Sequence, residues 1–290
     1  MKSEEEKLGD PGDQIFYHYT SQRGLLGIIK EKKIWATNIR YLNDEREFDY
    51  GIDEVLRVLK NGHPDSREDL SETVKSLLKR EDPVPVFVVS FSSDGGDELS
   101  QWRGYCQEGS GFSIGFEPEK LKELAQKQNF TIEPCVYKKS DQEAKIRAVI
   151  PSADEATIGG AASEADEEPF DLDSYLKKTG KERLHLLFDV SSLAPVLKHP
   201  KFKEEKEWRL ISKDPVICKN RLRFREANSM IVPYIEFDLS MGNESIPIKK
   251  IVIGPTPHKE LSKVSLEDFL SANEIGNCEV RVTEIPYRYW

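Results

Sequence analysis

The stretch at residues 86–116 constrains the fold of this chain most, because it sets two apolar runs on either side of a polar segment. The β-branched and aromatic residues at 86–91 are typical of a buried strand, and the Ser, Asp and Gly residues at 92–96 are typical of a turn. Residues 97–105 predict a short helix, and residues 112–116 predict a second strand. We therefore expect two neighbouring strands of one sheet, joined by a helical connection.

Polar and aromatic side chains are gathered in this connection. A hairpin with a purely structural role does not need Ser90, Ser92, Gln101, Trp102 and Arg103 in one place. Binding residues are often carried by connections on a rigid frame, so we expect these five to contribute to a ligand site. The helix with Trp102 is then expected to border the deepest cleft. The alternative is a well-capped hairpin whose tryptophan belongs to the core.

The rest of the chain predicts an α+β fold. Its apolar periodicity shows no regular alternation of strand and helix, which argues against a doubly wound sheet. The predicted strands lie at 15–19, 34–37, 131–137, 208–212, 221–225, 230–239, 246–253 and 278–285. The predicted helices lie at 22–32, 45–60, 66–80, 118–127 and 258–270.

The domain organisation is expected to be simple. Residues 14–290 are predicted to form a single domain, preceded by a disordered lead-in at 1–13. The acidic segment at 152–173 is rich in small residues and has no apolar period, so we expect a mobile insertion there. This segment could act as a lid, although a solvated linker is the simpler interpretation.

Composition excludes several classes of function. A net charge of −10 argues against a dedicated duplex-DNA or anionic-membrane binder, since both need a basic surface. No run approaches the ~20 apolar residues of a membrane span, and the N-terminus lacks the apolar stretch of a secretory signal. The four cysteines show no C-x-x-C pair and the five histidines no H-x-x-x-H spacing. We expect a cytoplasmic protein with free thiols and no metal site.

Two further groups carry candidate acid–base chemistry. His18 lies near the end of the first predicted strand, where a side chain on a rigid frame can reach a ligand, although a histidine bonded to backbone is the commoner outcome. Glu205 and Glu207 are two residues apart, so on a strand they would share one face. Such a pair can hold a ribose diol or stabilise a developing positive charge, with Arg209 or Arg103 relieving their repulsion. The alternative is a charged edge strand that blocks aggregation.

A third group is basic. Arg221, Arg223 and Arg225 alternate with apolar residues and would present three guanidinium groups on one strand face, which suits a phosphate or pyrophosphate. A solvated sheet face paired with acidic residues explains the pattern equally well. The chain contains no Rossmann, Walker A, hydrolase-elbow or zincin motif.

Several motifs, taken in order, resemble a widespread bacterial family of unknown function. They are YHYTS with GLLGIIKEKKIWATNIRYLND, SFSSDGGDELSQWRGY with GSGFSIGF, FKEEKEWRLI, IVIGP and IPYR. That family is in turn distantly similar to ADP-ribosyltransferase-like domains, which carry a His or Arg on the first strand, a Ser or Tyr on a middle strand, and a later Glu within E-x-E. The resemblance implies a split, mostly antiparallel sheet around a cleft.

The resemblance also implies the roles of individual residues toward NAD⁺ as substrate. His18 would contact the adenosine-side ribose, the backbone near Thr20 the nicotinamide amide, and Ser90 or Ser92 the nicotinamide pocket. Tyr19, Gln101 and Trp102 would complete that pocket.

The acidic and basic groups take the remaining roles. Glu207 would hold the nicotinamide ribose and stabilise the oxocarbenium-like transition state, with Glu205 orienting or activating the acceptor. Arg221 and Arg223, or Arg103, would neutralise the pyrophosphate.

The resulting hypothesis is an enzyme that transfers ADP-ribose from NAD⁺ to a protein or nucleic-acid acceptor, or to water. By analogy it would suit a toxin or an anti-phage effector. A non-catalytic sensor that binds a nucleotide in the same cleft is the second hypothesis, and a nucleic-acid-processing enzyme, disfavoured by the net charge, is the third.

Overall fold

The computed structural model describes residues 14–42, 46–60, 85–106, 111–149, 189–213, 220–227, 229–242 and 245–286. The predictions for the lead-in at 1–13, the helix at 66–80 and the insertion at 152–173 fall outside these residues and stay predictions.

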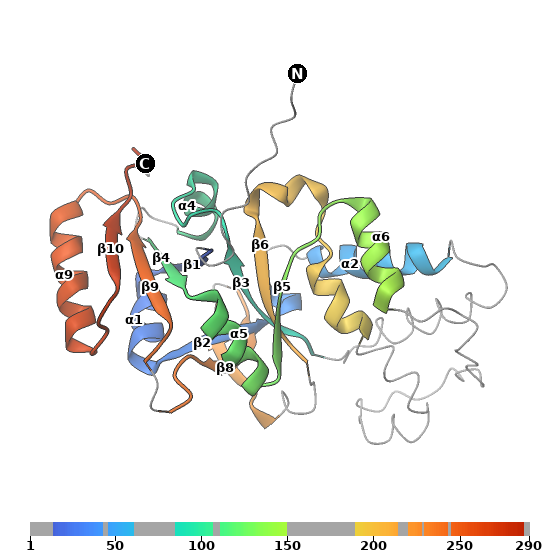
Figure 1. Ribbon diagram of the computed structural model, residues 1–290, viewed down its shortest axis with the longest axis horizontal. Coiled ribbons are helices and arrows are strands. Elements are labelled where there is room, and N and C mark those ends of the chain that lie inside the picture. The colour runs from blue at the N-terminus through green and yellow to red at the C-terminus, as the bar shows by residue number, and fades with distance from the viewer. Residues whose placement is uncertain are drawn as a thin grey trace.

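The described residues form an α+β fold around one mixed sheet (Figure 1). The strand order is β10-β9-β4-β1-β3-β2-β8-β7, with β6 joined to β3 and β5 joined to β6. Every strand pair is antiparallel except β9 with β10, so the prediction of a mostly antiparallel α+β fold is confirmed. The strands are β1 Phe16–Ser21, β2 Lys33–Asn38, β3 Phe87–Ser92, β4 Gly111–Phe116, β5 Phe130–Pro134, β6 Glu207–Ser212, β7 Arg223–Glu226, β8 Ile231–Asp238, β9 Ile248–Ile253 and β10 Glu279–Val282.

The helices begin and end within a few residues of the predicted positions wherever the two can be compared. Ser21 caps the first one, because its side chain accepts a hydrogen bond from the backbone N–H of Gly24. The α-helices are α1 Gln22–Glu31, α2 Glu47–Lys60, α4 Leu99–Tyr105, α5 Pro118–Lys127, α6 Lys139–Val149 and α9 Lys259–Ala272. Short 3₁₀ helices are η1 Ile39–Tyr41, η3 Ala194–Val196 and η4 Pro200–Glu205.

The sheet divides at β3. One edge of β3 pairs with β6 along five residues. The other edge is shared, because β1 pairs with it only at Ser92 and β2 pairs with it only at Val88 and Phe87. The backbone between these points, around Ser90, has no strand partner on that edge among the described residues. A split of this kind leaves room at the sheet surface for side chains and ligand atoms.

The two strands of the 86–116 stretch are not neighbours, which corrects the prediction from the sequence. The strand β1 lies between them and pairs with β4 along six residues. All six residues of β4 are buried, so this strand needs hydrogen-bond partners on both edges, and β1 and β9 provide them. A local hairpin between β3 and β4 would have left one of these edges without its partner.

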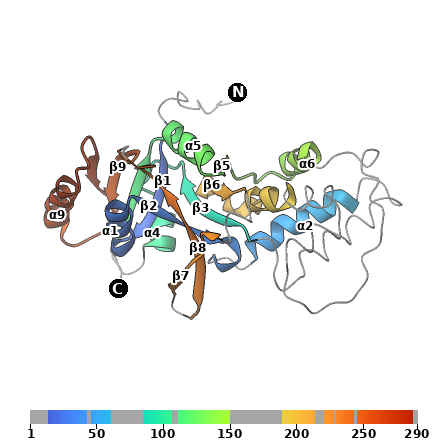
Figure 2. The same cartoon turned by 90° about the horizontal axis from the view of Figure 1, so that it is seen from below.

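Three groups of buried apolar side chains hold the layers together. The largest contains Phe16, Phe91 and Phe237 and packs α1, α5 and α9 against the sheet. The second packs α2, α6 and residues 189–197 against the other face of β3 and β6. The third is small and seats α4 on β1, with α4 and α5 on opposite sides of the sheet (Figure 2). The last group places α4 beside the split in the sheet.

Two other findings concern the expected cellular setting. No helix in the described ranges is both long and apolar enough to cross a membrane. Cys106, Cys135 and Cys278 are free thiols, whereas Cys218 lies outside the described residues.

Two glycines give opposite predictions for the stability of the helices. A Cβ at Gly51 in α2 would lie 2.2 Å from the carbonyl oxygen of Ala194, whereas a Cβ at Gly27 in α1 would meet nothing within 4 Å. We expect Gly27→Ala to raise the free energy of unfolding by about 0.5–1 kcal/mol, since alanine restricts the unfolded chain and favours helix. We expect Gly51→Ala to lower it by about 1–3 kcal/mol through overpacking. Urea unfolding measures the free energy of unfolding of both variants. An increase in both variants would contradict the close packing of α2 on η3.

Candidate functional site

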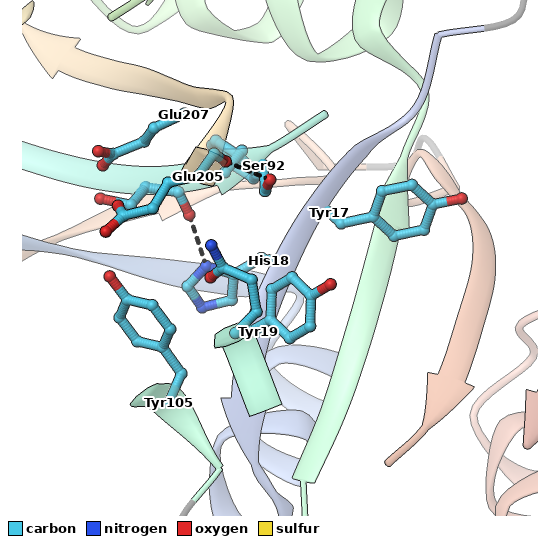
Figure 3. A pocket seen from close by; sticks show the side chains of 10 residues that line it. Tyr17, His18, Tyr19, Ser92, Tyr105, Glu205 and Glu207 are labelled. Atoms are coloured by element: carbon cyan, nitrogen blue, oxygen red, sulfur yellow. Dashed lines mark hydrogen bonds between the residues drawn. The ribbon is translucent and has the colours of Figure 1, made fainter. Parts of the chain in front are cut away.

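A pocket lies at the split in the sheet, between β1, β3, α4 and the turn that leads from η4 into β6 (Figure 3). Its volume is about 50 Å³. One water needs about 10–15 Å³, so the pocket has room for a few waters or a single small polar group. Its walls are formed by Tyr17, His18, Tyr19, Ser90, Phe91, Ser92, Gln101, Tyr105, Glu205 and Glu207. Seven of the twelve residues predicted for the site therefore line one pocket.

His18 lies at the centre of the split. Its Nδ1 is 3.0 Å from the carbonyl oxygen of Ser90, at the point where β3 has no strand partner. A carbonyl oxygen only accepts, so Nδ1 carries the proton in this bond. Burial lowers the pKa of His18, and the bond to Ser90 offsets only part of that effect. The ring is therefore neutral at pH 7, with Nε2 as an acceptor for a ligand.

Gln101 and Ser90 give the pocket neutral polar groups. Gln101 is 6% exposed, and its side-chain amide has no hydrogen-bond partner among the described residues. Ser90 lines the same pocket, and its hydroxyl is likewise unpartnered within that part of the chain. Buried polar groups normally have partners, so a buried amide that faces a pocket without one is a candidate ligand contact.

The two glutamates reach the pocket in a way that the sequence did not predict. Only Glu207 lies on β6, while Glu205 ends η4 and Lys206 between them has a left-handed backbone with φ of 43°. They are thus not on one strand face, and a tight turn brings them together instead. Ser92 holds this turn against β3 by donating its hydroxyl to the carbonyl oxygen of Glu205 at 2.5 Å. The alternative of an edge strand is wrong, because β6 pairs with both β3 and β5.

A buried cluster of charges lies behind the two glutamates. The Nζ atom of Lys198 is 2.5 Å from Oε2 of Glu205, 2.5 Å from Oε2 of Glu207 and 2.9 Å from Oε1 of Glu47. The guanidinium of Arg209 contacts Glu207 at 2.8 Å and Glu47 at 2.7 Å, and it donates to the carbonyl oxygen of Pro195. Three carboxylates thus share two cations that are 3% and 1% exposed.

The cluster separates the two glutamates chemically. Burial alone would raise the pKa of Glu207, but Arg209 and Lys198 outweigh it and lower that pKa to about 2. Burial raises the pKa of Glu205, and Lys198 offsets only part of that increase. Both oxygens of Glu207 are bound by cations, whereas only Oε2 of Glu205 has a protein partner within the described ranges. Glu205 therefore offers the carboxylate oxygen that a ligand can reach.

Other predicted site residues lie elsewhere. Trp102 is 1% exposed and packs edge-on against Tyr19 with ring centroids 4.9 Å apart, so it belongs to the core and does not line the pocket. Its helix still borders the pocket, through Gln101. Arg103 lies on the exposed side of α4, and the carbonyl oxygen of Thr20 accepts a contact from the Cys106 thiol.

Arg221 and Arg223 lie near β8 and are separated from His18 on β1 by the strands β3, β2 and β8. They line a separate groove together with Lys33 and Glu236, and Arg221 donates to the carbonyl oxygen of Glu236. They cannot serve as side walls of the His18 pocket, because β2 and β8 lie between.

Five residues of the site were not predicted: Tyr17, Phe91 and Tyr105 line the pocket, and Glu47 and Lys198 complete the charge cluster. Glu47 is distant in sequence from the two glutamates, whereas Lys198 precedes Glu205 by seven residues. Burial and the charges of Glu205 and Glu207 raise the pKa of Tyr105 to about 12. Its side chain is directed from α4 toward these glutamates at the pocket mouth (Figure 3). No group of three or more His, Cys, Asp or Glu side chains within the described ranges is placed to hold a metal ion.

Comparisons with known proteins bear on one part of the chain. Residues 101–210 match the family model described as "Protein of unknown function (DUF2971)", so the chain carries a domain of that description. The matched span contains Gln101, Glu205 and Glu207 but neither His18 nor Ser90. Neither the search of the curated proteins nor the search of the solved structures found a match.

The charge cluster predicts how stability depends on pH. The pKa of Glu207 is about 2 in the folded protein and about 4.3 in an unfolded chain, so its ionised form stabilises the fold. That contribution is complete above pH ~5 and is lost as the pH falls toward 2, a total of about 3 kcal/mol. The pKa of Glu205 is raised in the folded protein, so the protonated form of Glu205 stabilises the fold. That contribution is present at low pH and is lost as the pH rises.

We expect Glu207→Gln to lower the free energy of unfolding at pH 7 by about 3–5 kcal/mol, because it leaves buried cations without their counter-charge. It should also flatten the acid limb of the stability curve. The exposed neighbour Glu204 provides a matched control, and Glu204→Gln should change neither quantity. Denaturant unfolding measures the free energy of unfolding at pH 7 and its decrease in acid. It is carried out from about pH 2.5 to about pH 7, because the contribution of Glu207 is lost within this range. Equal behaviour of the two variants would contradict the cluster.

Proposed function

We propose that this pocket binds the nicotinamide riboside end of NAD⁺ and that the protein breaks the glycosidic bond to nicotinamide. ADP-ribose would pass to water or to an acceptor group. The observation that carries the proposal is the convergence of a strand histidine, a strand serine and an E-x-E turn at one split in a sheet. These are the three positions that the resemblance to ADP-ribosyltransferase-like domains requires.

The groups of the pocket suit the two parts of this ligand. The unpartnered amide of Gln101 and the hydroxyl of Ser90 match the hydrogen-bonding groups of a carboxamide. The neutral His18 offers Nε2 as an acceptor to a ribose hydroxyl. The pocket volume of about 50 Å³ suits the carboxamide, and the rest of a dinucleotide would extend outward from the mouth.

The geometry favours Glu205 over Glu207 as the group that stabilises the oxocarbenium-like transition state. Both oxygens of Glu207 are committed to Arg209 and Lys198, whereas Glu205 keeps one oxygen for the ligand. Glu207 would act as a positioning residue, since it fixes Lys198, which in turn holds Glu205. In this scheme Ser92 positions Glu205 through its backbone and has no direct contact with the ligand.

The reaction balances without a further cofactor. The C1′–N bond breaks and its electron pair stays on the nitrogen, so nicotinamide leaves as a neutral molecule. A water or an acceptor hydroxyl attacks C1′ and loses one proton. Glu205, whose pKa is raised, is suited to accept that proton at neutral pH.

The proposal also implies a type of fold, a cellular location and a biological role. The protein would have an ADP-ribosyltransferase-like fold and act in the cytoplasm, as a toxin or an anti-phage effector. These roles come from analogy with the resembled domains.

A nucleotide sensor without catalysis is the second candidate. The observation that favours it is the pairing of both glutamates with Lys198, which reduces the negative charge available to a transition state. A sensor would bind NAD⁺ in the same pocket and release no nicotinamide.

The decisive variant for catalysis is Glu205→Gln, which keeps the shape of the side chain and removes its charge. We expect nicotinamide release to fall by ~10²–10³, the usual cost of losing a transition-state charge contact. NAD⁺ binding should persist, since the ground state carries less positive charge at C1′. Chromatography of released nicotinamide measures the rate, and Glu204→Gln is the matched control. Wild-type protein that binds NAD⁺ but releases nothing would leave the sensor as the function.

A separate variant tests the ligand contact itself. Gln101→Leu replaces an amide by an apolar group of similar volume, and we expect it to weaken NAD⁺ binding about 10-fold through one lost hydrogen bond. The exposed Gln126 on α5 gives the control, Gln126→Leu. Calorimetric titration with NAD⁺ and with ADP-ribose compares the three proteins. Unchanged affinity in Gln101→Leu would show that the nicotinamide end binds elsewhere.

A further inference from the structure

A second surface, separate from the pocket, lies on β2, β7 and β8. Trp35 on β2 is 47% exposed, although it stands on a sheet whose other apolar side chains are mostly buried. It packs against Tyr234 on β8 with ring centroids 4.5 Å apart and planes at 32°. An indole held in this way presents one broad apolar face to the exterior.

Arginines lie along the β7 side of this aromatic pair, while Glu236 is opposite Trp35 on β8. Arg223 is directly opposite Tyr234 in the ladder, Arg225 follows it on the same face, and Arg221 lies beside them. The Nε of Arg225 is buried and has no hydrogen-bond partner among the residues that the structure describes. We call Trp35, Tyr234, Arg221, Arg223 and Arg225 the arginine–tryptophan face.

The charge of this face is opposite to that of the chain. The groove along its edge, about 550 Å³ in volume, is lined by the cations Lys33, Lys127, Arg221 and Arg223 and by two carboxylates. One of these carboxylates, Glu236, is already paired with Lys33 at 2.7 Å. With Arg225 the surface has five cations against two anions, in a chain whose net charge is −10. Such a local excess of positive charge attracts an anionic partner.

We propose that the arginine–tryptophan face binds single-stranded nucleic acid. A single strand offers unstacked bases to an exposed aromatic ring and phosphates to a short row of arginines, which is the combination present here. A duplex keeps its bases stacked and needs a wider basic surface.

The face lies on the same side of the sheet as the pocket, with the buried residues Thr37 and Val88 between them. Thr37 is opposite Val88 in the ladder between β2 and β3, so Trp35 and Thr37 lie on the same sheet face as Val88, Ser90 and Ser92. Figure 2 shows β7 and β8 projecting on the side of the sheet that carries α4. A strand bound here would therefore lie on the side of the sheet on which the pocket opens. If the proposed function holds, a nucleic acid is then the acceptor of ADP-ribose, and this last step rests on that proposal.

Binding is tested first, in the absence of NAD⁺, with a fluorescein-labelled oligonucleotide of about 12 thymidines. Anisotropy titrations at about 50 mM and about 200 mM salt give the affinity and its salt dependence. We expect Trp35→Ala to weaken binding about 5- to 100-fold, through the loss of one stacked base. We expect Arg223→Ala to reduce the slope of log K against log salt by about 0.7.

Phe224 provides a matched aromatic control. It is 62% exposed in the same hairpin but points to the opposite sheet face, since its neighbour Arg223 is opposite Tyr234. Phe224→Ala should bind like the wild type. Melting curves accompany every variant, and the exposed Arg223 keeps the test valid if Trp35→Ala loses stability.

Several results would overturn the proposal: no binding at the lower salt, equal losses in Trp35→Ala and Phe224→Ala, or equal affinity for a duplex of the same length. Displacement by a poly-glutamate peptide as efficiently as by unlabelled oligonucleotide would show a general anion surface instead. These titrations contain no NAD⁺, and nicotinamide release is measured without oligonucleotide. Failure of one proposal is therefore seen separately from failure of the other.

Discussion

The buried contact of Lys198 with three carboxylates is the interaction on which the site depends. It joins the helix α2, the last residue of η4 and the interior strand β6 at one atom. Removing two cations and three carboxylates from water costs solvation free energy. Their mutual attraction offsets this cost only while every partner is in place. Any movement of α2 or of the turn would separate charges in a region of low dielectric. The cluster therefore holds the pocket wall rigid and sets the position of Glu205.

The cluster also explains why two glutamates two residues apart are not equivalent. The left-handed backbone at Lys206 ends η4 and turns Glu207 inward onto β6, where Arg209 shares its face. Glu205 stays at the surface of the cluster, where it lines the pocket and only its Oε2 is bound, by Lys198, among the described residues. A carboxylate that is held by one lysine and is otherwise exposed to a ligand combines fixed geometry with usable charge, as electrostatic catalysis requires.

The division of the sheet at β3 relates the pocket to the rest of the surface. Because β1 and β2 share one edge of β3, the space between them is closed by a side chain, His18, and not by a strand. The same sheet face continues across β2 to Trp35 and Tyr234. A pocket with neutral and acidic groups and a basic aromatic surface thus lie on the same side of the sheet, which is the arrangement that the proposed reaction between a dinucleotide and an anionic acceptor would need.

The sequence by itself determined most of the local structure, although not the helix α6, and most of the groups in the pocket. Apolar periodicity located the strands, Ser21 predicted a helix start, and His18, Ser90, Gln101 and Glu205 were identified from their neighbours along the chain. Only the tertiary structure decided that β1 separates β3 from β4, because partners for a fully buried strand are chosen among distant segments. It likewise brought Lys198 and Glu47 to the glutamates and moved Arg221 and Arg223 away from them. Pairing across a sheet and burial of charge depend on contacts between residues far apart in sequence, which local patterns do not encode.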